Sequence, residues 1–599
     1  MFGLGKGQKF DLIRAPFGRR GSGFYLFEDY NLPLIRLSNT KADSTMSGGN
    51  LIFDLKILQN GRPVRYHYFG DAGSLKMTQY GEVNGTAEVA LTEHDHLRIR
   101  GNCGLRLELR SMREGNGAIA CKGVFPFLDG SGTEVFFGGQ GKMFFKALEG
   151  SICVNAQYDK AEGKYKSLVV EITPDQKTDC YDIAVHEYMD GEFGYDGVYE
   201  PFDKLIAINK ADFEAFKQNY NKAAADYQEA AEYAMWLTWT HRVKPGGFIK
   251  SPMILMHLQW LNACCAWQQS LHACAMHGEP KEGWRQICSL FEHQNEKTGQ
   301  LPGMLFYSGG GAIQAPFQGF ALDYLIRRCG DGFLTAEECK RMYPKFAKWT
   351  NYWTTYRSAK RGDDMISVKS PHDSGWDDAS IFKDGFPAST PDLIAFLVAL
   401  MYGTARLAKG AGEEEAAKDW NFRADRLLNQ LITEFWDGER FIAKKNGVTP
   451  VDSWSLANYQ PILLGDRLPK HIIDKVTEKL TTEGEYLSPI GLCTESMKSP
   501  LCSFVNQFVL GRVVGPANMI ITAGLYIAGK KKEAAMIARR LCDKMKEEGM
   551  ILGFAPYDRN PLTGEKIEFN VPPGANDPWP WSGWAAGSFL TMATTVIED

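Results

Sequence analysis

One stretch of the chain carries an unusual density of ionisable side chains. Residues 370–380 read Ser-Pro-His-Asp-Ser-Gly-Trp-Asp-Asp-Ala-Ser, with carboxylates at Asp373, Asp377 and Asp378. Carboxylates this close together cost solvation free energy unless they lie in a wet or catalytic site. Trp376 could desolvate the carboxyl next to it and raise its pKa. The alternative is a capping-and-turn cluster, because Asp and Ser are common turn residues.

The elements before this stretch have a period of two. Segments 51–58 and 64–69 flank Asn60-Gly61, a pair that supplies the positive φ angles of a two-residue hairpin. Residues 97–110 alternate apolar with charged side chains, as half-buried antiparallel strands do. Many short strands without helical stretches predict an antiparallel β-sandwich.

The rest of the chain has the period of 3.6 expected of amphipathic helices. Thr335 and Glu338 form a capping box that predicts a helix over 335–357, and further helices are expected over 252–277 and 390–409. About a dozen such segments, separated by Gly- and Pro-rich loops, predict six helical hairpins closed into an (α/α)6 toroid. The carboxylate-rich stretch lies between two of these helices, and functional residues concentrate on loops held by a rigid scaffold.

These patterns divide the chain into three parts. We expect a β-sandwich over 1–205, a linker helix over 206–225 and the toroid over 226–599. The net charge of −5 favours neither nucleic acid nor an anionic membrane as partner. Without a membrane-spanning run, a signal peptide or C-x-x-C spacing among the 13 cysteines, we expect a cytoplasmic protein with reduced thiols. No metal or nucleotide motif passes its context test, so we expect no metal and no cofactor.

The carboxylate-rich loop resembles the E-S-G-W-D signature of inverting glycosidases with a six-hairpin barrel, namely trehalases and especially glycoside hydrolase family 63. Asp373 stands in place of the usual glutamate, Ser374-Gly375-Trp376 match, and Asp377 matches the aspartate that serves as general acid. The resemblance covers roughly residues 225–597. Its other blocks are Gln294–Pro302, Gln314-Ala315-Pro316, Gly491–Ser496, Gly511–Asn518, Pro561–Glu565 and Trp581-Ser582.

The resemblance implies a mechanism with two carboxyl groups. Asp377 would protonate the leaving oxygen, and a carboxylate about 6.5–9.5 Å away would activate water. Relatives place this base shortly before a P-x-T-G segment, where this chain has Ala555. The nearby candidates, in order of preference, are Asp558 and Glu495, then Glu565 and Glu568. The alternative is that none of them acts as the base.

Other side chains are candidates for holding a sugar. Indole rings can stack on the apolar face of a sugar, although core packing is their commoner use. Relatives have aspartate after the tryptophan at 267, where this chain has Gln268, which suggests an altered substrate or mechanism. The substrate-binding candidates are His372, Asp373, Trp376, Asp378, Trp267, Gln268, Gln314, Arg512, Trp454 and Trp581, with Trp260, Trp579 and Trp584 as further tryptophans.

We therefore expect an enzyme that cleaves a small α-glycoside, in particular an α-glucoside, with inversion. Its partner would be a small carbohydrate, and an oligomer is left open. The missing base leaves two alternatives. One is an inverting phosphorylase, in which phosphate replaces the protein base, and the other is a noncatalytic sugar-binding barrel.

Overall fold

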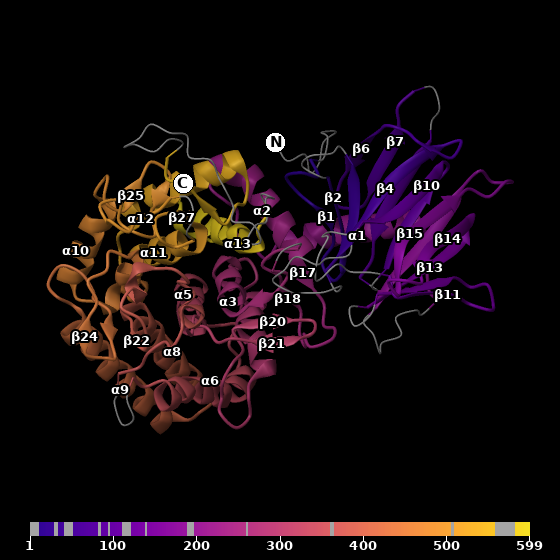
Figure 1. Cartoon of the computed structure of the whole chain (residues 1–599). Coiled ribbons are helices and arrows are strands. Elements are labelled where there is room, and N and C mark those ends of the chain that lie inside the picture. The colour runs from indigo at the N-terminus through magenta and orange to yellow at the C-terminus, as the bar shows by residue number, and fades with distance from the viewer. Residues whose placement is uncertain are drawn as a thin grey trace.

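Strands occupy the N-terminal part of the chain, and helices dominate the rest (Figure 1). A computed structural model describes residues 11–28, 34–40, 52–81, 85–93, 96–110, 121–137, 141–188, 197–258, 261–359, 365–504, 508–557 and 581–598.

The N-terminal strands form two antiparallel sheets of eight strands each. The first has the order β1-β2-β3-β4-β10-β15-β14, with β5 paired to β4. Its strands are β1 (Phe17–Gly18), β2 (Phe24–Glu28), β3 (Ile35–Asn39), β4 (Ile52–Gln59), β5 (Arg62–Pro63), β10 (Gly104–Arg110), β14 (Ser151–Asp159) and β15 (Lys164–Thr173). The second has the order β11-β12-β13-β16-β9-β8-β7-β6. Its strands are β6 (Tyr66–Gly70), β7 (Leu75–Gln79), β8 (Thr86–Leu91), β9 (His96–Gly101), β11 (Gly123–Pro126), β12 (Thr133–Phe136), β13 (Lys142–Glu149) and β16 (Tyr181–Tyr188).

The period of two separates the core from the outer face of the first sheet. Leu55 of β4 and Leu107 of β10 are register partners and are fully buried. Arg106, one position earlier, is partly exposed and pairs with Glu171 of β15 at 2.6 Å. The predicted antiparallel β-sandwich is confirmed.

The Asn60-Gly61 turn forms as predicted, but the strand after it is short. Asn60 (φ 52°) and Gly61 (φ 75°) join β4 to β5 in a hairpin. The next strand, β6, belongs to the second sheet and pairs with β7. The prediction that residues 64–69 return along 51–58 was wrong: the Val64 N–H still donates to the carbonyl of Ile57 at 3.0 Å, but the chain then leaves β4 and continues into the second sheet.

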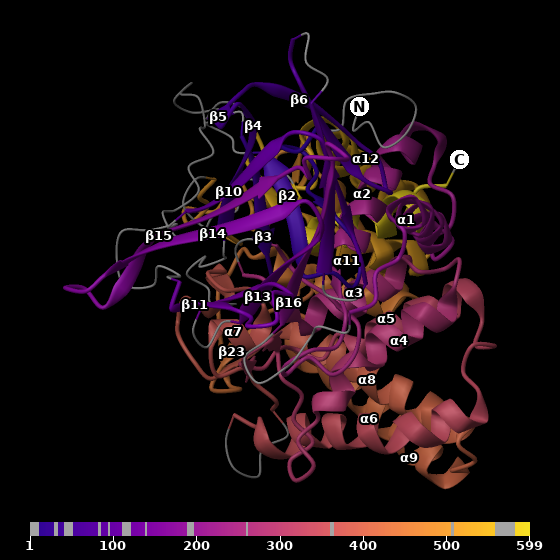
Figure 2. The ribbon, with the colours of Figure 1, turned by 90° about the vertical axis from the view of Figure 1, so that its right-hand side faces the viewer.

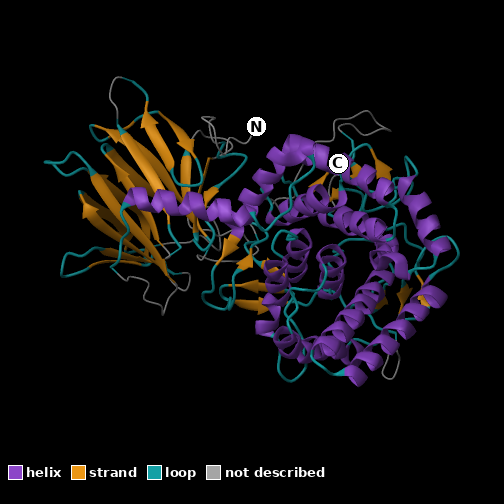
Figure 3. Cartoon of the chain, turned by 180° about the vertical axis from the view of Figure 1, so that it is seen from behind, coloured by secondary structure: helices purple, strands orange, loops and turns teal. Residues whose placement is uncertain are grey.

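Beyond α1 (Phe202–Lys217), helices alternate along the chain between an outer and an inner ring (Figure 3). Among the described residues the inner ring is α3 (Ala266–Ala275), α5 (Gln318–Cys329), α8 (Pro391–Gly410), the 3-10 segment η5 (Leu456–Arg467), α11 (Gly515–Ile527) and α13 (Gly583–Thr591). The outer ring is α2 (Gln228–His241), α4 (Pro280–Cys288), α6 (Ala336–Tyr356), α9 (Glu414–Gln430), α10 (Lys470–Thr481) and α12 (Lys531–Glu548). Each inner helix packs on the next, and α13 closes on α3. The predicted (α/α)6 toroid is confirmed.

Burial differs between the rings. Inner α11 is buried along all but its last residue, Ile527. In outer α12, burial is confined to one stripe: Ala534, Ile537, Ala538, Leu541, Cys542 and Met545. Inner α8 is long and apolar enough to cross a membrane by composition, but 78% of its most apolar window is buried inside the protein. Its hydropathy therefore reflects its place in the inner ring.

Two helix predictions had different outcomes. Helix α6 begins where the capping box indicates, since Thr335 Oγ1 accepts a hydrogen bond from the backbone N–H of Glu338 at 3.2 Å. The helix expected over 252–277 forms only as α3. The residues before α3 include the strands β18 (Met253–Ile254) and β19 (Cys264–Cys265). Leu261 between them has φ 49°, which interrupts a right-handed helix.

The sandwich contacts the toroid through residues of both parts (Figure 2, with the sandwich in front). Trp236 Nε1 of α2 donates to the carbonyl of Pro16 at 2.9 Å, and Asn262 Nδ2 donates to the carbonyl of Thr40 at 2.9 Å. These contacts join the two parts through hydrogen bonds between buried groups.

Candidate active site

The carboxylate-rich loop lies between outer helix α6 and the start of inner helix α8. Its first residues form one short helical turn, α7 (Pro371–Ser374). Gly375 ends this turn in the left-handed conformation, with φ 79°, a backbone geometry that glycine adopts at little cost. A Cβ at this position would lie 3.5 Å from the Trp267 ring, so the turn is seated against α3.

Asp377, the predicted general acid, combines exposure with a perturbed protonation equilibrium. Its side chain is 49% exposed, and its Oδ1 lies 3.5 Å from His372 Nδ1. Burial by the surrounding protein raises the pKa of Asp377 above 3.8; Asp378 raises it further, and His372 opposes the shift. A carboxyl group that solvent can reach, and that holds its proton more tightly than usual, suits proton donation.

Trp376, next to Asp377, points into the core. It is 2% exposed, and its Nε1 donates to Gln460 Oε1 of η5 at 3.3 Å. Its backbone N–H donates to Ser374 Oγ at 2.9 Å. The prediction that Trp376 holds substrate was wrong: the indole anchors the loop to the inner ring.

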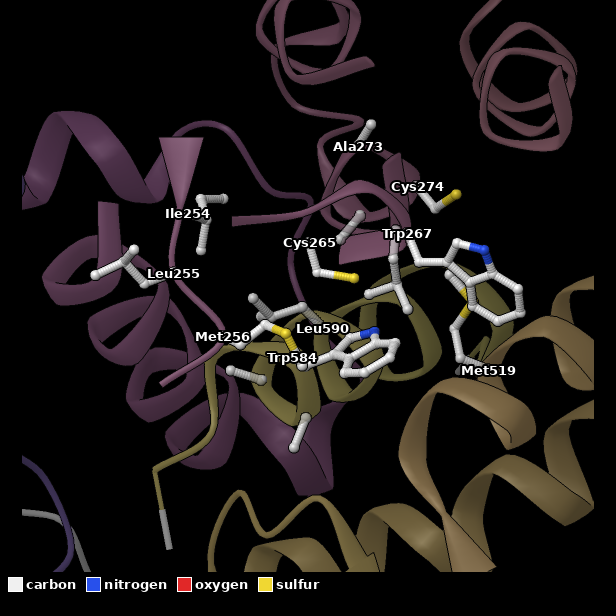
Figure 4. Packing of buried hydrophobic residues seen from close by; sticks show 14 of the residues in the cluster. Ile254, Leu255, Met256, Cys265, Trp267, Ala273, Cys274, Met519, Trp584 and Leu590 are labelled. Atoms are coloured by element: carbon white, nitrogen blue, oxygen red, sulfur yellow. The ribbon is translucent and has the colours of Figure 1, made fainter. Parts of the chain in front are cut away.

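Trp267 is likewise a core residue. It is 3% exposed, packs on Phe317 and Phe396 with ring centroids 5.5 and 5.3 Å away, and donates from Nε1 to the carbonyl of Ala315 at 3.0 Å. Figure 4 shows it among buried apolar side chains that include Cys265, Met519 and Trp584. The prediction that its ring stacks on sugar is therefore corrected.

Asp373 is buried in an ion pair. Its Oδ2 is paired with the guanidinium of Arg357 and accepts the backbone N–H of Lys369 at 2.9 Å. Both side chains of the pair are 10% exposed. Asp373 was expected to contact substrate, but its partners show that it holds the first turn of the loop to the end of α6.

Asp378 holds the other end of the loop. Its two carboxylate oxygens accept the backbone N–H groups of Phe508 and Val509, each at 2.7 Å. Buried Arg512 lies close enough for its charge to interact with Asp378, and its Nε donates to the carbonyl of Phe504 at 3.4 Å. Asp378, also predicted to bind substrate, instead joins the loop to the segment before α11.

The remaining substrate-binding candidates fall into two groups. Gln268, Gln314 and Trp581 are buried, at 0%, 6% and 0% exposure, which corrects their prediction as substrate ligands. Gln268 Nε2 donates to the carbonyl of Leu255, Gln314 Oε1 accepts from Cys265 Sγ, and Trp581 packs on Tyr25 and Phe27 of the sandwich. His372, exposed over 70% of its side chain, and the half-buried Trp454 stay candidates for substrate contact.

The two leading candidates for the base have different outcomes. Glu495 is 0% exposed, and its two oxygens accept hydrogen bonds from Ser380 Oγ (2.7 Å) and Ser499 Oγ (2.6 Å). A base must reach water, so this burial removes Glu495 as a candidate. Asp558 lies outside the described residues, as do Glu565, Glu568, Trp260 and Trp579.

The groups that hold the loop carry little signal in the sequence. Arg357 precedes Asp373 by 16 residues and carries no local signal of the pairing. Ser380 is part of the loop, and its Oγ lies 2.9 Å from Ser453 Oγ as well as contacting Glu495. A small hydroxyl residue three positions after the acid was the one available hint.

Comparison with known proteins shows which family and which fold the chain resembles. The family model for the mannosylglycerate hydrolase MGH1-like glycoside hydrolase domain matches residues 263–582, more than half of the chain. No curated protein matches the chain. A bacterial glucoamylase complexed with acarbose superposes with a TM-score of 0.55 at 11% identity, covering 99% of this chain and 96% of that one, and so shares the fold. A GH63 mannosylglycerate hydrolase from Thermus thermophilus, in complex with Tris and D-glycerate, is 14% identical, with a TM-score of 0.48 over 60% of this chain and 98% of that one.

Proposed function

The chain belongs to the family of MGH1-like glycoside hydrolase domains, and from this premise we propose that it cleaves a small α-glycoside with inversion, using Asp377 as the general acid. An α-glucoside is the first substrate to test. An α-mannoside of a small acid is the second, since the family's description names mannosylglycerate. We further propose that the enzyme acts on small metabolic sugars in the cytoplasm.

The observation that carries the proposal is the environment of Asp377. Of the three aspartates in the loop, Asp377 is the one whose carboxyl group is half exposed, and burial by the surrounding protein raises its pKa. Its neighbours Asp373 and Asp378 are held by protein partners, which keep the loop in place around it. Protonated Asp377 would give its proton to the leaving oxygen, and water would attack the opposite face of the sugar.

Phosphorolysis is the second candidate function. Ala555 occupies the position where relatives carry the base, and Glu495 is sealed from solvent. A phosphate ion brings its own nucleophilic oxygen and needs no protein base. Incubating the enzyme with α-glucosides and α-mannosyl glycerate, with and without phosphate, separates the two reactions. Free sugar formed without phosphate supports hydrolysis, whereas a sugar phosphate formed only with phosphate supports phosphorolysis.

Asp377→Asn tests the acid. We expect kcat on a disaccharide to fall by about 10²–10⁴-fold, because the amide cannot donate the proton. The fold should be retained: the pKa of Asp377 is raised in the folded protein, so its ionised form lowers stability at neutral pH, and asparagine removes that charge. Asp384→Asn, an exposed carboxylate seven residues farther along, is the matched control and should retain activity. Full activity in Asp377→Asn contradicts the assignment, and no turnover by the unaltered enzyme on any glycoside favours a sugar-binding barrel.

A further inference from the structure

A second carboxylate, Glu495, is linked to the loop of Asp377 without reaching solvent. It follows strand β26 (Gly491–Leu492) and pairs in a β-bridge with Ser455, at the start of η5. Its side chain is fully buried, and each of its carboxylate oxygens accepts one serine hydroxyl. A buried carboxylate is costly to desolvate unless hydrogen bonds or charges compensate. We therefore expect the Glu495 carboxylate to have a role besides packing.

The hydrogen bonds on one side of Glu495 lead into the carboxylate-rich loop that contains Asp377. The backbone N–H of Ser455 donates to Ser453 Oγ at 3.1 Å, and Ser453 Oγ lies 2.9 Å from Ser380 Oγ. Ser380 Oγ in turn donates to Glu495 Oε2 at 2.7 Å. Each hydroxyl has one proton to donate, so the chain has a single consistent direction that ends on the carboxylate.

The opposite side of the carboxylate leads away from the loop. Ser499 Oγ donates to Glu495 Oε1, and the backbone N–H of Ser499 is bonded within its own turn to the carbonyl of Ser496. The Cys502 thiol also lies near Glu495 on this side, whereas Lys383, whose charge acts on Glu495, belongs to the segment of Ser380. Glu495 therefore joins three segments, of which only the one at Ser380 contains the proposed acid.

We propose that Glu495 is a positioning residue for Asp377: through Ser380 it fixes the backbone that follows the acid. The inference rests on the proposed function, because it assigns Glu495 to the proton-donation step. Asp378 ties the same backbone to Phe508 and Val509, and Glu495 adds the anchor three residues beyond the acid. An error of about 1 Å in the position of a reacting group can lower a rate by about 100-fold.

The test compares two leaving groups. Disaccharides leave only after protonation, whereas fluoride leaves from an α-glycosyl fluoride without needing a proton. In Glu495→Gln one carboxylate oxygen is replaced by an NH2 group, which donates and does not accept, so the serine hydroxyl that faces it loses its acceptor. We expect kcat on the disaccharide to fall by about 10–100-fold, with KM changed less than about threefold and kcat on α-glucosyl or α-mannosyl fluoride also changed less than about threefold.

Two single hydroxyl deletions supply a matched control. Ser380→Ala breaks the link toward Asp377, and Ser499→Ala removes a hydroxyl from the same carboxylate on the far side. We expect Ser380→Ala to reproduce the leaving-group-dependent loss even if Glu495→Gln does not fold, and Ser499→Ala to stay within about threefold of the unaltered enzyme. Equal losses in the two serine variants, or equal losses on both kinds of substrate, overturn the proposal in favour of a general structural role.

Asp377→Asn, assayed beside these variants, separates this inference from the proposed function. If Asp377→Asn is inactive on disaccharides while Glu495→Gln and Ser380→Ala are normal, the positioning role is wrong and the acid assignment stands. If Asp377→Asn is fully active, the acid assignment fails and the positioning role fails with it.

Discussion

Three aspartates of one short loop differ in what surrounds each carboxyl group. Asp373 is ion-paired with buried Arg357, and Asp378 accepts two backbone N–H groups. Asp377 lies beside exposed His372 with half of its side chain in contact with solvent. An ionised carboxylate is stabilised by cations and N–H donors and destabilised by burial, so the three groups suit different tasks. At the residue scale, partners rather than residue type decide which aspartate is available to react.

The Arg357–Asp373 pair leads to a prediction about stability. Arg357→Leu leaves the Asp373 carboxylate buried without its cation, and we expect it to lower the free energy of unfolding by about 3–5 kcal/mol in urea titrations. Lys418→Ala, which breaks a pair with Glu415 that is exposed on both sides, should cost less than about 1 kcal/mol. Adding Asp373→Asn to Arg357→Leu should recover much of the lost free energy of unfolding, since no unpaired charge is then buried. A cost below about 1 kcal/mol for Arg357→Leu contradicts this account.

At the scale of elements, glycines let neighbouring inner helices approach closely. A Cβ on Gly319 of α5 would lie 2.2 Å from the backbone nitrogen of Leu400 in α8. A Cβ on Gly524 of α11 would lie 2.7 Å from the carbonyl carbon of Ile462 in η5. Because α8 (Pro391–Gly410) follows the carboxylate-rich loop along the chain, the spacing of the inner ring helps set where that loop lies.

Gly319→Ala and Gly403→Ala form a matched pair at the α5–α8 contact. A Cβ on Gly403 would meet its nearest atom, Leu322 Cδ2, at 3.5 Å, an ordinary van der Waals contact. We expect Gly403→Ala to be neutral or to stabilise by up to about 1 kcal/mol through helix propensity. Gly319→Ala must move a helix backbone and should cost about 1–3 kcal/mol. Thermal and urea unfolding of both variants measure the difference, and equal stabilities would show that the α5–α8 contact is looser than described.

At the scale of the whole molecule, the sandwich and the toroid share a buried seam. Trp581, just before α13, packs against Tyr25 and Phe27 of β2, and the Tyr25 hydroxyl donates to the carbonyl of Leu258 at 3.2 Å. The toroid side of this region also holds buried His241 and His272, close to glycines of α13. Neither histidine can be protonated without placing a charge in the interior.

These histidines predict a loss of stability in mild acid. Burial lowers the pKa of both His241 and His272 from 6.5 to about 3. Below pH 6.5 the folded protein therefore binds fewer protons than the unfolded chain. The stability that the two neutral histidines contribute is complete above that pH and is lost as pH falls toward their folded pKa. Each group should lower the free energy of unfolding by up to about 1.4 kcal/mol per pH unit.

Urea unfolding at about pH 7.5, 6.0 and 5.0 checks this prediction. His272→Gln should reduce the pH dependence, whereas His471→Gln, at an exposed position of α10, should leave it unchanged. The same slope in His272→Gln as in the unaltered protein would contradict the assignment.

The two-part architecture could be predicted from the sequence, because the signals involved are local. The change from a period of two to one of 3.6, the Asn60-Gly61 turn and the Thr335–Glu338 capping box each depend on residues within one turn or one strand. The Ser374-Gly375-Trp376-Asp377 stretch was enough to indicate the glycosidase family, and the family model agrees.

Which side chains are buried and which reach solvent depends on contacts between segments that are distant in the chain. Glu495 and Ser380 are 115 residues apart, and Asp378 and Val509 are 131 apart, so no local pattern reports that they meet. Trp267, Trp376 and Trp581 look alike in sequence as sugar platforms, yet each fills a core or a seam. A side chain's exposure, charge and protonation depend on the partners that the fold brings to it. For that reason the sequence could indicate Asp377 as the candidate acid, whereas the protein partners that hold Asp373 and Asp378 were not predictable from it.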